Sequence, residues 1–231
     1  MPKFQKIMAT ISDKTEVAKD TYLLRMVNPD GSVFEFEPGQ FATITVAENT
    51  KRSYSIASIP GKSYVDFIAD MKRGGPGSQF FASAQVGDSV EMLIPLGNFY
   101  YVDAQKPVYF FGTGTGIVPF MSMAEHALTN LKSPRMMYLY AGFRYEEEIF
   151  GKQDLAMLDV MHENFIFQVS LTQPTESWQG SCGRITKFID ELKDTDIECY
   201  VCGSNEMVKD VSDRLKAKGV PAEQIYFEMF Y

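Results

Sequence analysis

One segment sets the architecture of the second half of the chain: Val108-Tyr-Phe-Phe-Gly-Thr-Gly-Thr-Gly-Ile-Val-Pro119. A short apolar run leads into alternating glycines, and a helical pattern follows. Glycines let the backbone approach a ligand closely, and the start of a helix presents free N–H groups to phosphate. The order strand, glycine turn and helix indicates a nucleotide-binding unit, although Gly116 comes one residue earlier than in the usual dinucleotide spacing. Taken alone, the segment also fits a tight structural turn.

From this segment to the end of the chain, predicted strands alternate with predicted helices. The strands are expected at Val108–Phe111, Met136–Ala141, Phe165–Leu171, Glu198–Cys202 and Ile225–Phe230. The helices are expected over Ile117–Leu131, Gln153–His162, Ile185–Leu192 and Asn205–Lys218. Strict alternation predicts an α/β domain, built as a doubly wound parallel sheet with helices on both faces.

The first half of the chain has a different sequence pattern, in which short segments rich in Val, Ile, Phe, Tyr and Thr are separated by turn signals. The predicted strands are Phe4–Ile11, Thr21–Val27, Phe41–Val46, Arg52–Ala57, Tyr64–Met71 and Ser89–Leu93. Many short strands with regular turns indicate an antiparallel β-barrel or β-sandwich. We therefore predict two domains, a β-barrel over residues 1–103 and the α/β domain over residues 104–231.

A second motif, Arg52-Ser-Tyr-Ser-Ile-Ala-Ser58, falls on a predicted barrel strand. Alternation along a strand puts Arg52 and Tyr54 on one face. An arginine can form paired hydrogen bonds with a pyrophosphate, and a tyrosine ring can lie flat on a planar cofactor. In isolation, the same residues also fit an ordinary surface strand.

The composition is that of a globular protein, with 45% hydrophobic and 23% charged residues. The net charge of −8 disfavours nonspecific binding of nucleic acid, which depends on Lys and Arg at phosphates. No apolar run approaches the ~18 residues that cross a bilayer, and the start lacks the apolar stretch of a signal peptide. We therefore expect a cytoplasmic protein with no membrane span and no nucleic-acid partner.

The three cysteines, Cys182, Cys199 and Cys202, are too few for an iron–sulfur cluster held by four thiolates of one chain. Cys199 and Cys202 lie three apart on a predicted strand, so they should face opposite sides and not form a redox or zinc pair. His126 and His162 fall on predicted helices, where partial solvation is the simpler interpretation. We therefore expect no metal site.

Both motifs together resemble the ferredoxin–NADP reductase superfamily, since their order and separation match. The resemblance extends through further segments along nearly the whole chain: Pro38-Gly-Gln-Phe41, Gly75-x-x-Ser78, Pro95-Leu-Gly-Asn-Phe99, Cys202-Gly-Ser204 and Phe227-Glu-Met-Phe230. It implies a FAD-binding barrel, an NAD(P)-binding α/β domain, and hydride transfer from NADH or NADPH to FAD. Several motifs in a fixed order are far more specific than any one of them.

The resemblance also implies roles for residues of the barrel. Arg52 would bind the FAD pyrophosphate, Tyr54 would pack on one side of the isoalloxazine, and Ser55 would lie near flavin N5. The pyrophosphate loop would be completed by Gly75, Gly77 and Ser78, through backbone N–H groups and a hydroxyl at a helix start.

In the α/β domain, the resemblance assigns the pyridine nucleotide to the glycine turn. That turn comprises Gly112, Thr113, Gly114, Thr115 and Gly116, with Thr115 near the nicotinamide end. Cys202, followed by Gly203, would approach the nicotinamide itself, against the alternative of a plain buried cysteine. Glu228 would serve in proton transfer or in positioning the nicotinamide. Phe230 would cover the flavin, although Tyr231 is an alternative ring. Glu228 and Phe230 also fit a simple role in closing the sheet.

A preference for NADPH over NADH depends on cationic side chains that bind the 2′-phosphate of NADPH. In bacterial relatives that use NADPH, arginines occur at three places. Arg144 and Arg184 resemble the first and the last, but Leu171 occupies the middle one. We expect NADH or both nucleotides to be used.

The electron acceptor is expected to be a separate protein, because the two predicted domains fill the chain and its cysteines exclude an internal cluster. The candidates are a ferredoxin, a flavodoxin or an oxygenase component, since the Phe-Glu-Met-Phe ending resembles oxygenase reductases. One alternative is an NAD(P)H:flavin reductase, which treats flavin as a substrate. The pyrophosphate loop argues against it, because such a loop should hold FAD tightly. A second alternative is a nucleotide-binding module without turnover.

Overall fold

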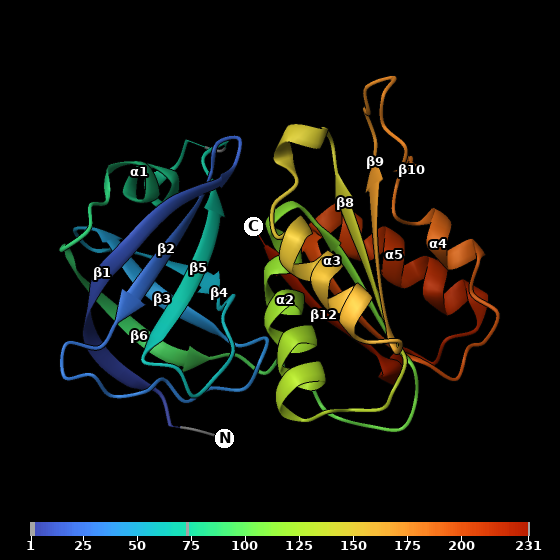
Figure 1. Ribbon diagram of the computed structural model, residues 1–231, viewed down its shortest axis with the longest axis horizontal. Helices are drawn as coiled ribbons and strands as arrows, with labels where there is room; N and C mark the ends of the chain where they lie inside the picture. Colours follow the sequence, from blue (N-terminus) through green and yellow to red (C-terminus); the bar gives the residue numbers. More distant parts are fainter. Residues whose placement is uncertain (1–2, 73, 231) are drawn as a thin grey trace. The chain divides into compact units, whose positions relative to one another are not determined.

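The computed structural model describes residues 3–72 and 74–230, apart from the side chain of Phe230. The chain divides into two compact units (Figure 1). The first contains Met1–Tyr101 and Met121–His126, and the second contains Val102–Phe120 and Ala127–Tyr231. Each has its own sheet, so the expected two-domain architecture is confirmed.

The first unit is a six-stranded antiparallel sheet that curls toward a barrel, with strand order β4-β3-β6-β1-β2-β5. Its strands are β1 (Gln5–Ala18), β2 (Thr21–Val27), β3 (Phe41–Ala47), β4 (Thr50–Ser55), β5 (Tyr64–Asp70) and β6 (Ser89–Leu96). The bridge between Ile56 and Phe67 joins the two ends of this order. One helix, α1 (Pro76–Ser83), lies between β5 and β6 in sequence.

Alternation of side chains builds the interior of the first unit. Along β3, Ala42, Ile44 and Val46 are buried, while the residues between them are half-buried. The inward-facing residues meet the ring of Phe81 from α1, which is fully buried in the same cluster. Because α1 is anchored through this ring, the start of the helix is fixed against the sheet.

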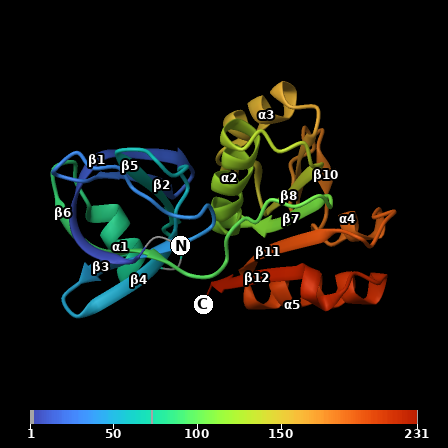
Figure 2. The same cartoon turned by 90° about the horizontal axis from the view of Figure 1, so that it is seen from below.

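The second unit is a six-stranded parallel sheet with strand order β10-β9-β8-β7-β11-β12. Its strands are β7 (Val108–Thr113), β8 (Met137–Phe143), β9 (Phe165–Leu171), β10 (Ser181–Cys182), β11 (Glu198–Ser204) and β12 (Ile225–Phe230). Helices α2 (Val118–Glu125) and α3 (Lys152–Met161) lie on one face, and α4 (Lys187–Asp190) and α5 (Asn205–Lys218) lie on the other (Figure 2). This confirms the predicted parallel sheet covered on both sides.

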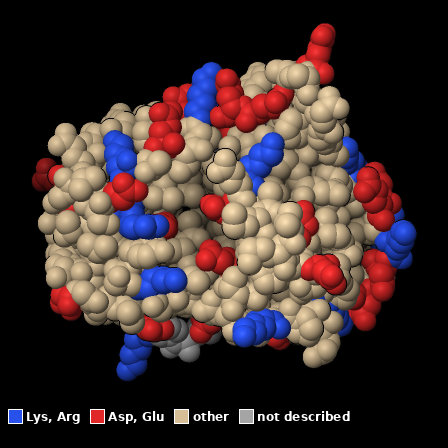
Figure 3. Space-filling model, viewed as in Figure 1, with Lys and Arg blue, Asp and Glu red and all other residues tan. Residues whose placement is uncertain are grey.

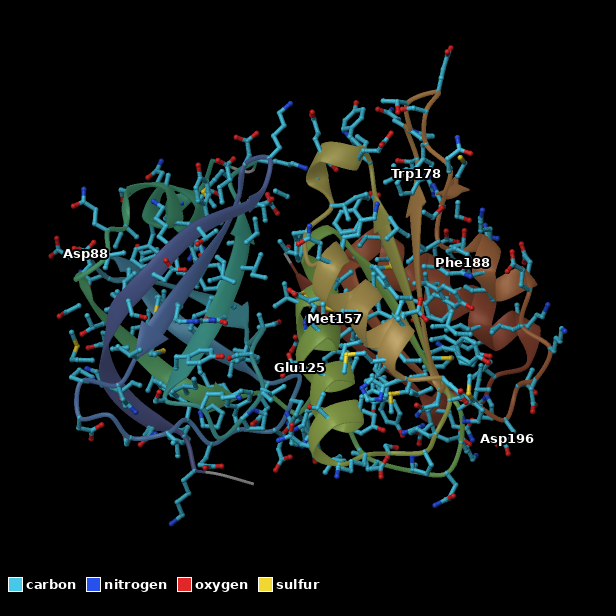
Figure 4. All side chains as sticks on the ribbon, in the orientation of Figure 1. Asp88, Glu125, Met157, Trp178, Phe188 and Asp196 are labelled. Atoms are coloured by element: carbon cyan, nitrogen blue, oxygen red, sulfur yellow. The ribbon has the colours of Figure 1, made fainter. Side chains whose placement is uncertain are left out.

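Aromatic contacts fix the helices to both faces of this sheet. On one face, the ring of Phe120 lies 5.1 Å from that of Phe110. On the other face, Phe188 of α4, labelled in Figure 4, stacks on Tyr140 with centroids 4.2 Å apart. The ends of the central strands are therefore held at fixed positions relative to the helices that follow them.

The structure differs from the predicted elements in the extent of β1, which runs on to Ala18 where a strand ending at Ile11 was expected, and in the extent of helices. The helix expected over Ile117–Leu131 is instead a 3-10 turn at Gly114–Ile117, then α2, then a π-helical segment at His126–Asn130. The helix expected over Ile185–Leu192 shortens to α4. The short strand β10 was not predicted, because two residues carry no periodicity. Within the described residues, no helix is long and apolar enough to cross a membrane.

Candidate active site

Strand β4 presents Arg52 and Tyr54 on one face, as alternation predicts. They pair with Ile44 and Ala42 of β3, whose side chains point into the barrel. The ring of Tyr54 is half-buried and lies 4.9 Å from that of Phe81 at an angle of 48°. Burial raises the pKa of the Tyr54 phenol to about 12, although the charge of Arg52 lowers it. The phenol is therefore neutral at physiological pH.

The start of α1 lies directly against these two side chains. A Cβ on Gly77 would overlap the Tyr54 hydroxyl and would come within 3.6 Å of Arg52 Cγ. The first turn of α1 contains no acidic residue, so the partial positive charge of the helix end is not neutralised locally. The exposed Arg52 guanidinium donates one hydrogen bond to the carbonyl of Lys51 at 2.8 Å. A guanidinium beside a helix start provides the donors that a pyrophosphate requires.

The remaining residues of the predicted pyrophosphate loop lie at the same helix end. Gly75 is the N-cap residue, and a Cβ there would meet nothing within 4 Å. The hydroxyl of Ser78 donates to the carbonyl of Asp70 at 3.3 Å. The loop therefore offers backbone N–H groups, while this hydroxyl is directed toward the end of β5.

Ser55, at the end of β4, has a buried hydroxyl for which the described residues supply no hydrogen-bond partner. The side chain is 4% exposed. A buried hydroxyl without a partner is unfavourable, so this atom is suited to bind a polar group of a ligand. Together with the Arg52 and Gly77 cradle, it makes the barrel residues fit FAD.

The glycine turn is packed tightly on the end of β11. A Cβ on Gly116 would overlap the carbonyl of Cys202, and one on Gly112 would come within 2.9 Å of Ile117 Cγ2. Gly114 has a φ of +53° and open space beside its Cα. Thr113 and Thr115 are half-buried. The turn therefore needs glycine on its inner side for packing and leaves its backbone accessible on the other side.

Cys202 lies in one row across three strands, paired with Gly112 of β7 and Glu228 of β12. Its side chain is fully buried. Burial raises the pKa of the Cys202 thiol well above its usual value, and the charge of Glu228 adds to this shift. The group is therefore a neutral thiol at physiological pH. Cys199 sits three positions earlier on the same strand and faces the other side, as predicted.

Two arginines flank the end of β9. Arg144 follows β8 and is exposed, and Arg184 follows β10 with 80% of its side chain exposed. The Arg184 guanidinium is 3.9 Å from the carboxylate of Asp210, which is a weak pairing at that exposure. Leu171, between them on β9, is fully buried. The two guanidinium groups are thus available to solvent, whereas the middle position offers no polar contact.

The other candidate residues are placed as follows. Gly203 follows Cys202 and pairs with Met229 of β12. The ring of Phe230 and all of Tyr231, proposed to cover the flavin, lie outside the described residues. His126 is half-buried, and burial lowers the pKa of its imidazole.

Across residues 3–72 and 74–230, no group of three or more His, Cys, Asp or Glu side chains is placed to hold a metal ion. On the face seen in Figure 3, acidic and basic side chains are interspersed. Sequence reasoning gave no role to Ser58 and Ser122, although the hydroxyl of Ser122 donates to the carbonyl of Ser58 at 2.7 Å. No local pattern could have indicated this contact.

Two family models match the chain, one to each half. The oxidoreductase FAD-binding domain matches residues 8–101, and the oxidoreductase NAD-binding domain matches residues 110–213. The chain belongs to the ferredoxin–NADP reductase superfamily. Members of this family bind FAD and a nicotinamide nucleotide, so the expected cofactors and the expected oxidoreductase class are confirmed.

Individual relatives cover most of the chain at low identity. The electron transfer component of toluate 1,2-dioxygenase from Pseudomonas putida is 27% identical over 226 residues, which are 96% of this chain and 67% of that protein. Ferredoxin–NADP reductase B from Sorangium cellulosum is 28% identical over 87% of this chain and 88% of its own length. A crystal structure of a ferredoxin NADP+ reductase from Neisseria gonorrhoeae, with bound FAD and NADP, covers 100% of both chains with a TM-score of 0.81 at 22% identity. The last likeness supports the fold.

Proposed function

We propose that this chain takes hydride from NADH or NADPH onto FAD and passes the electrons to a separate redox protein. The observation that carries the proposal is the cradle in the first unit, where Arg52, Tyr54 and the start of α1 at Gly77 come together. Beside it, the buried Ser55 hydroxyl lacks a partner among the described residues. The second unit adds the glycine turn that a nucleotide requires.

Bound FAD supplies an acceptor for hydride at N5 and releases electrons singly to one-electron acceptors. Arg52 and the backbone N–H groups at the start of α1 hold the pyrophosphate, and the neutral ring of Tyr54 packs on the isoalloxazine. Ser55 provides a hydroxyl near N5. Each group therefore binds or orients the cofactor.

In the second unit, the turn from Gly112 to Gly116 binds the nucleotide phosphates through its accessible backbone. Thr115 and Cys202 would lie toward the nicotinamide, with the thiol held neutral by burial. A thiol in this state is a small apolar neighbour that excludes water and does not attack the ring. Glu228, beside Cys202, holds or transfers a proton.

The acceptor we propose is a ferredoxin, a flavodoxin or an oxygenase component. This choice is supported by relatives whose names describe electron transfer components of dioxygenases. Arg144 and Arg184 support use of NADPH, whereas Leu171 does not, so we propose use of NADH or of both nucleotides. Because reduced nicotinamides are metabolites of the cytoplasm, we propose that the reaction takes place there.

Anaerobic bleaching tests the proposal directly. The purified protein should be yellow, and its flavin absorption should fall on addition of one equivalent of NADH or NADPH. Reoxidation by a ferredoxin, a flavodoxin or an oxygenase component should then restore the colour. A polypeptide that remains colourless and takes up no added FAD would refute the proposal.

The same experiment separates the alternatives. Loss of flavin on dialysis, with turnover that depends on added free flavin, would identify a flavin reductase. Retained flavin that neither nucleotide bleaches would identify a nucleotide-binding module without turnover.

A further inference from the structure

The helix that follows the glycine turn contributes a buried hydroxyl to the first unit. Residues of α2 from Met121 onward belong to the same compact unit as the barrel strands. Ser122 is fully buried on this helix, and its Oγ donates to the carbonyl oxygen of Ser58 at 2.7 Å. Ser58 closes the motif that begins at Arg52, so a helix residue far away in sequence holds the end of the segment.

The chain from Ile56 to Ser58 leaves β4 and is held by contacts from separate elements. The N–H of Ile56 donates to the carbonyl of Gln40 at 3.0 Å, and that of Ala57 donates to the carbonyl of Asp66 at 2.8 Å. The N–H of Asp66 in turn donates to the hydroxyl of Ser58 at 3.1 Å. Ser58 is therefore fixed at its side chain by β5 and at its carbonyl by α2.

Asp66 is itself held in place, so the hydrogen bond from its N–H to the Ser58 hydroxyl has a fixed donor. Its carboxylate receives hydrogen bonds from Arg25 Nε at 2.8 Å and Arg25 Nη2 at 2.9 Å. The guanidinium of Arg25 lies 3.8 Å from the ring centroid of Tyr64. The contact from α2, by contrast, depends on the Ser122 hydroxyl alone. Removal of this hydroxyl therefore leaves the carbonyl of Ser58 without its hydrogen bond from α2.

We propose that Ser122 is a positioning residue for FAD, because its hydroxyl holds the carbonyl of Ser58, where the segment that carries Arg52, Tyr54 and Ser55 ends. This inference rests on the proposed binding of FAD by the segment from Arg52 to Ser55. Ser55 is three residues from the tied carbonyl, and its buried hydroxyl has no partner within the described residues. A shift of Ser58 moves that hydroxyl and the Tyr54 ring away from the positions that the flavin needs.

The second unit offers a matched control. Ser170 is also fully buried, and its Oγ donates to the carbonyl of Gly183 at 2.7 Å. Ser170→Ala and Ser122→Ala therefore delete the same kind of hydrogen bond from a fully buried serine, to an acceptor that is buried at Ser58 and exposed at Gly183. A general loss of stability should appear in both variants, whereas an effect on FAD binding should appear only in Ser122→Ala.

The test measures FAD affinity of the apoprotein by quenching of flavin fluorescence, below the melting temperature of each variant. Ser122→Ala should raise the dissociation constant of FAD about tenfold, as expected for one lost buried hydrogen bond, and should blur the visible flavin absorption bands. Ser170→Ala should bind FAD within about twofold of the wild type. Ser122→Thr, which keeps the hydroxyl, should recover most of the lost affinity if it folds.

Equal FAD affinities for Ser122→Ala and Ser170→Ala would overturn the inference, whatever the behaviour of Ser122→Thr. A wild-type apoprotein that binds no FAD would instead refute the proposed function. Thermal melting of all variants shows whether the deletions at the two positions are comparable in stability. The two failures are thus distinguished by the wild-type titration alone.

Discussion

Replacing Gly77 by alanine tests whether the start of α1 and the β4 residues form one binding site. The added Cβ would overlap the Tyr54 hydroxyl, while Tyr54 Cζ and Arg52 Cγ would be 3.5 and 3.6 Å away. The hydroxyl would have to retreat by more than about 1 Å to reach ordinary contact. Because both groups are proposed to hold FAD, the variant should bind it more weakly.

The magnitude follows from the contact that is disturbed. That contact is the proposed packing of the Tyr54 ring on the flavin; an aromatic pair contributes about 0.5–1.5 kcal/mol beyond its buried area, and about 1.4 kcal/mol corresponds to a factor of ten in affinity. The dissociation constant of FAD should therefore rise by about two- to tenfold in Gly77→Ala. Alanine is a better helix former than glycine by about 1 kcal/mol, so the melting temperature of the apoprotein should not fall in parallel.

Two further variants make this titration decisive. Ser83→Ala changes an exposed residue at the other end of α1, outside the proposed pyrophosphate loop, and should leave FAD affinity unchanged. In the double variant Tyr54→Phe with Gly77→Ala, the overlapping hydroxyl is gone and only the ring contact near 3.5 Å remains. The double variant should therefore bind FAD nearly as well as Tyr54→Phe alone. Wild-type affinity in Gly77→Ala, or no relief by Tyr54→Phe, would refute the reasoning.

Three other predictions concern a buried ion pair, the ionisation of two tyrosines and an exposed arginine of the second unit. Arg135→Leu should destabilise the protein by about 3–5 kcal/mol, measured by urea unfolding, because the Arg135 side chain is 1% exposed and donates to Glu198 at 2.7 Å. The pKa values of Tyr54 and Tyr140 are raised by burial to about 12 from 10.0. These protonated phenols stabilise the fold fully below pH 10, and this stability should disappear as the pH rises toward 12; an unfolding midpoint that is constant over that range would contradict it. Arg144→Gln should raise the KM for NADPH about tenfold and leave that for NADH within about twofold, measured by steady-state kinetics; equal effects on both would exclude a contact with the 2′-phosphate.

Local patterns predicted most of the fold because strands and turns are encoded over a few residues. The six residues of β12, Ile225–Phe230, and the long helix α5 have the expected bounds. The path after the glycine turn was less predictable, since apolar periodicity continues through Leu131. There the helix changes from α to π at His126, next to the point where the chain passes from one compact unit to the other. Tertiary contacts of this kind override a local helical pattern.

In the candidate site too, features set by neighbouring residues could be predicted from the sequence, whereas contacts between separate elements could not. Alternation alone placed Arg52 and Tyr54 on one face, and a glycine turn between strand and helix was visible in the sequence. The close approach of Gly77 to Tyr54 and the bond between Ser122 and Ser58 join residues from separate elements. Such contacts depend on how elements pack, for which one sequence carries no direct signal.

The electrostatics of the two units suggest how binding and chemistry are separated in this protein. Charge is placed where phosphates are proposed to bind, at Arg52 and at the start of α1. The side chains proposed to lie near the rings are kept neutral: Tyr54 by a pKa of about 12 and Cys202 by burial of its thiol. An ionised group next to a ring in a low-dielectric interior would change the energy of hydride transfer by far more than one in water. We therefore infer that charged groups away from the rings bind the cofactors, and that neutral side chains near the rings orient them without changing their reactivity. Glu228 is the ionisable group proposed for proton transfer.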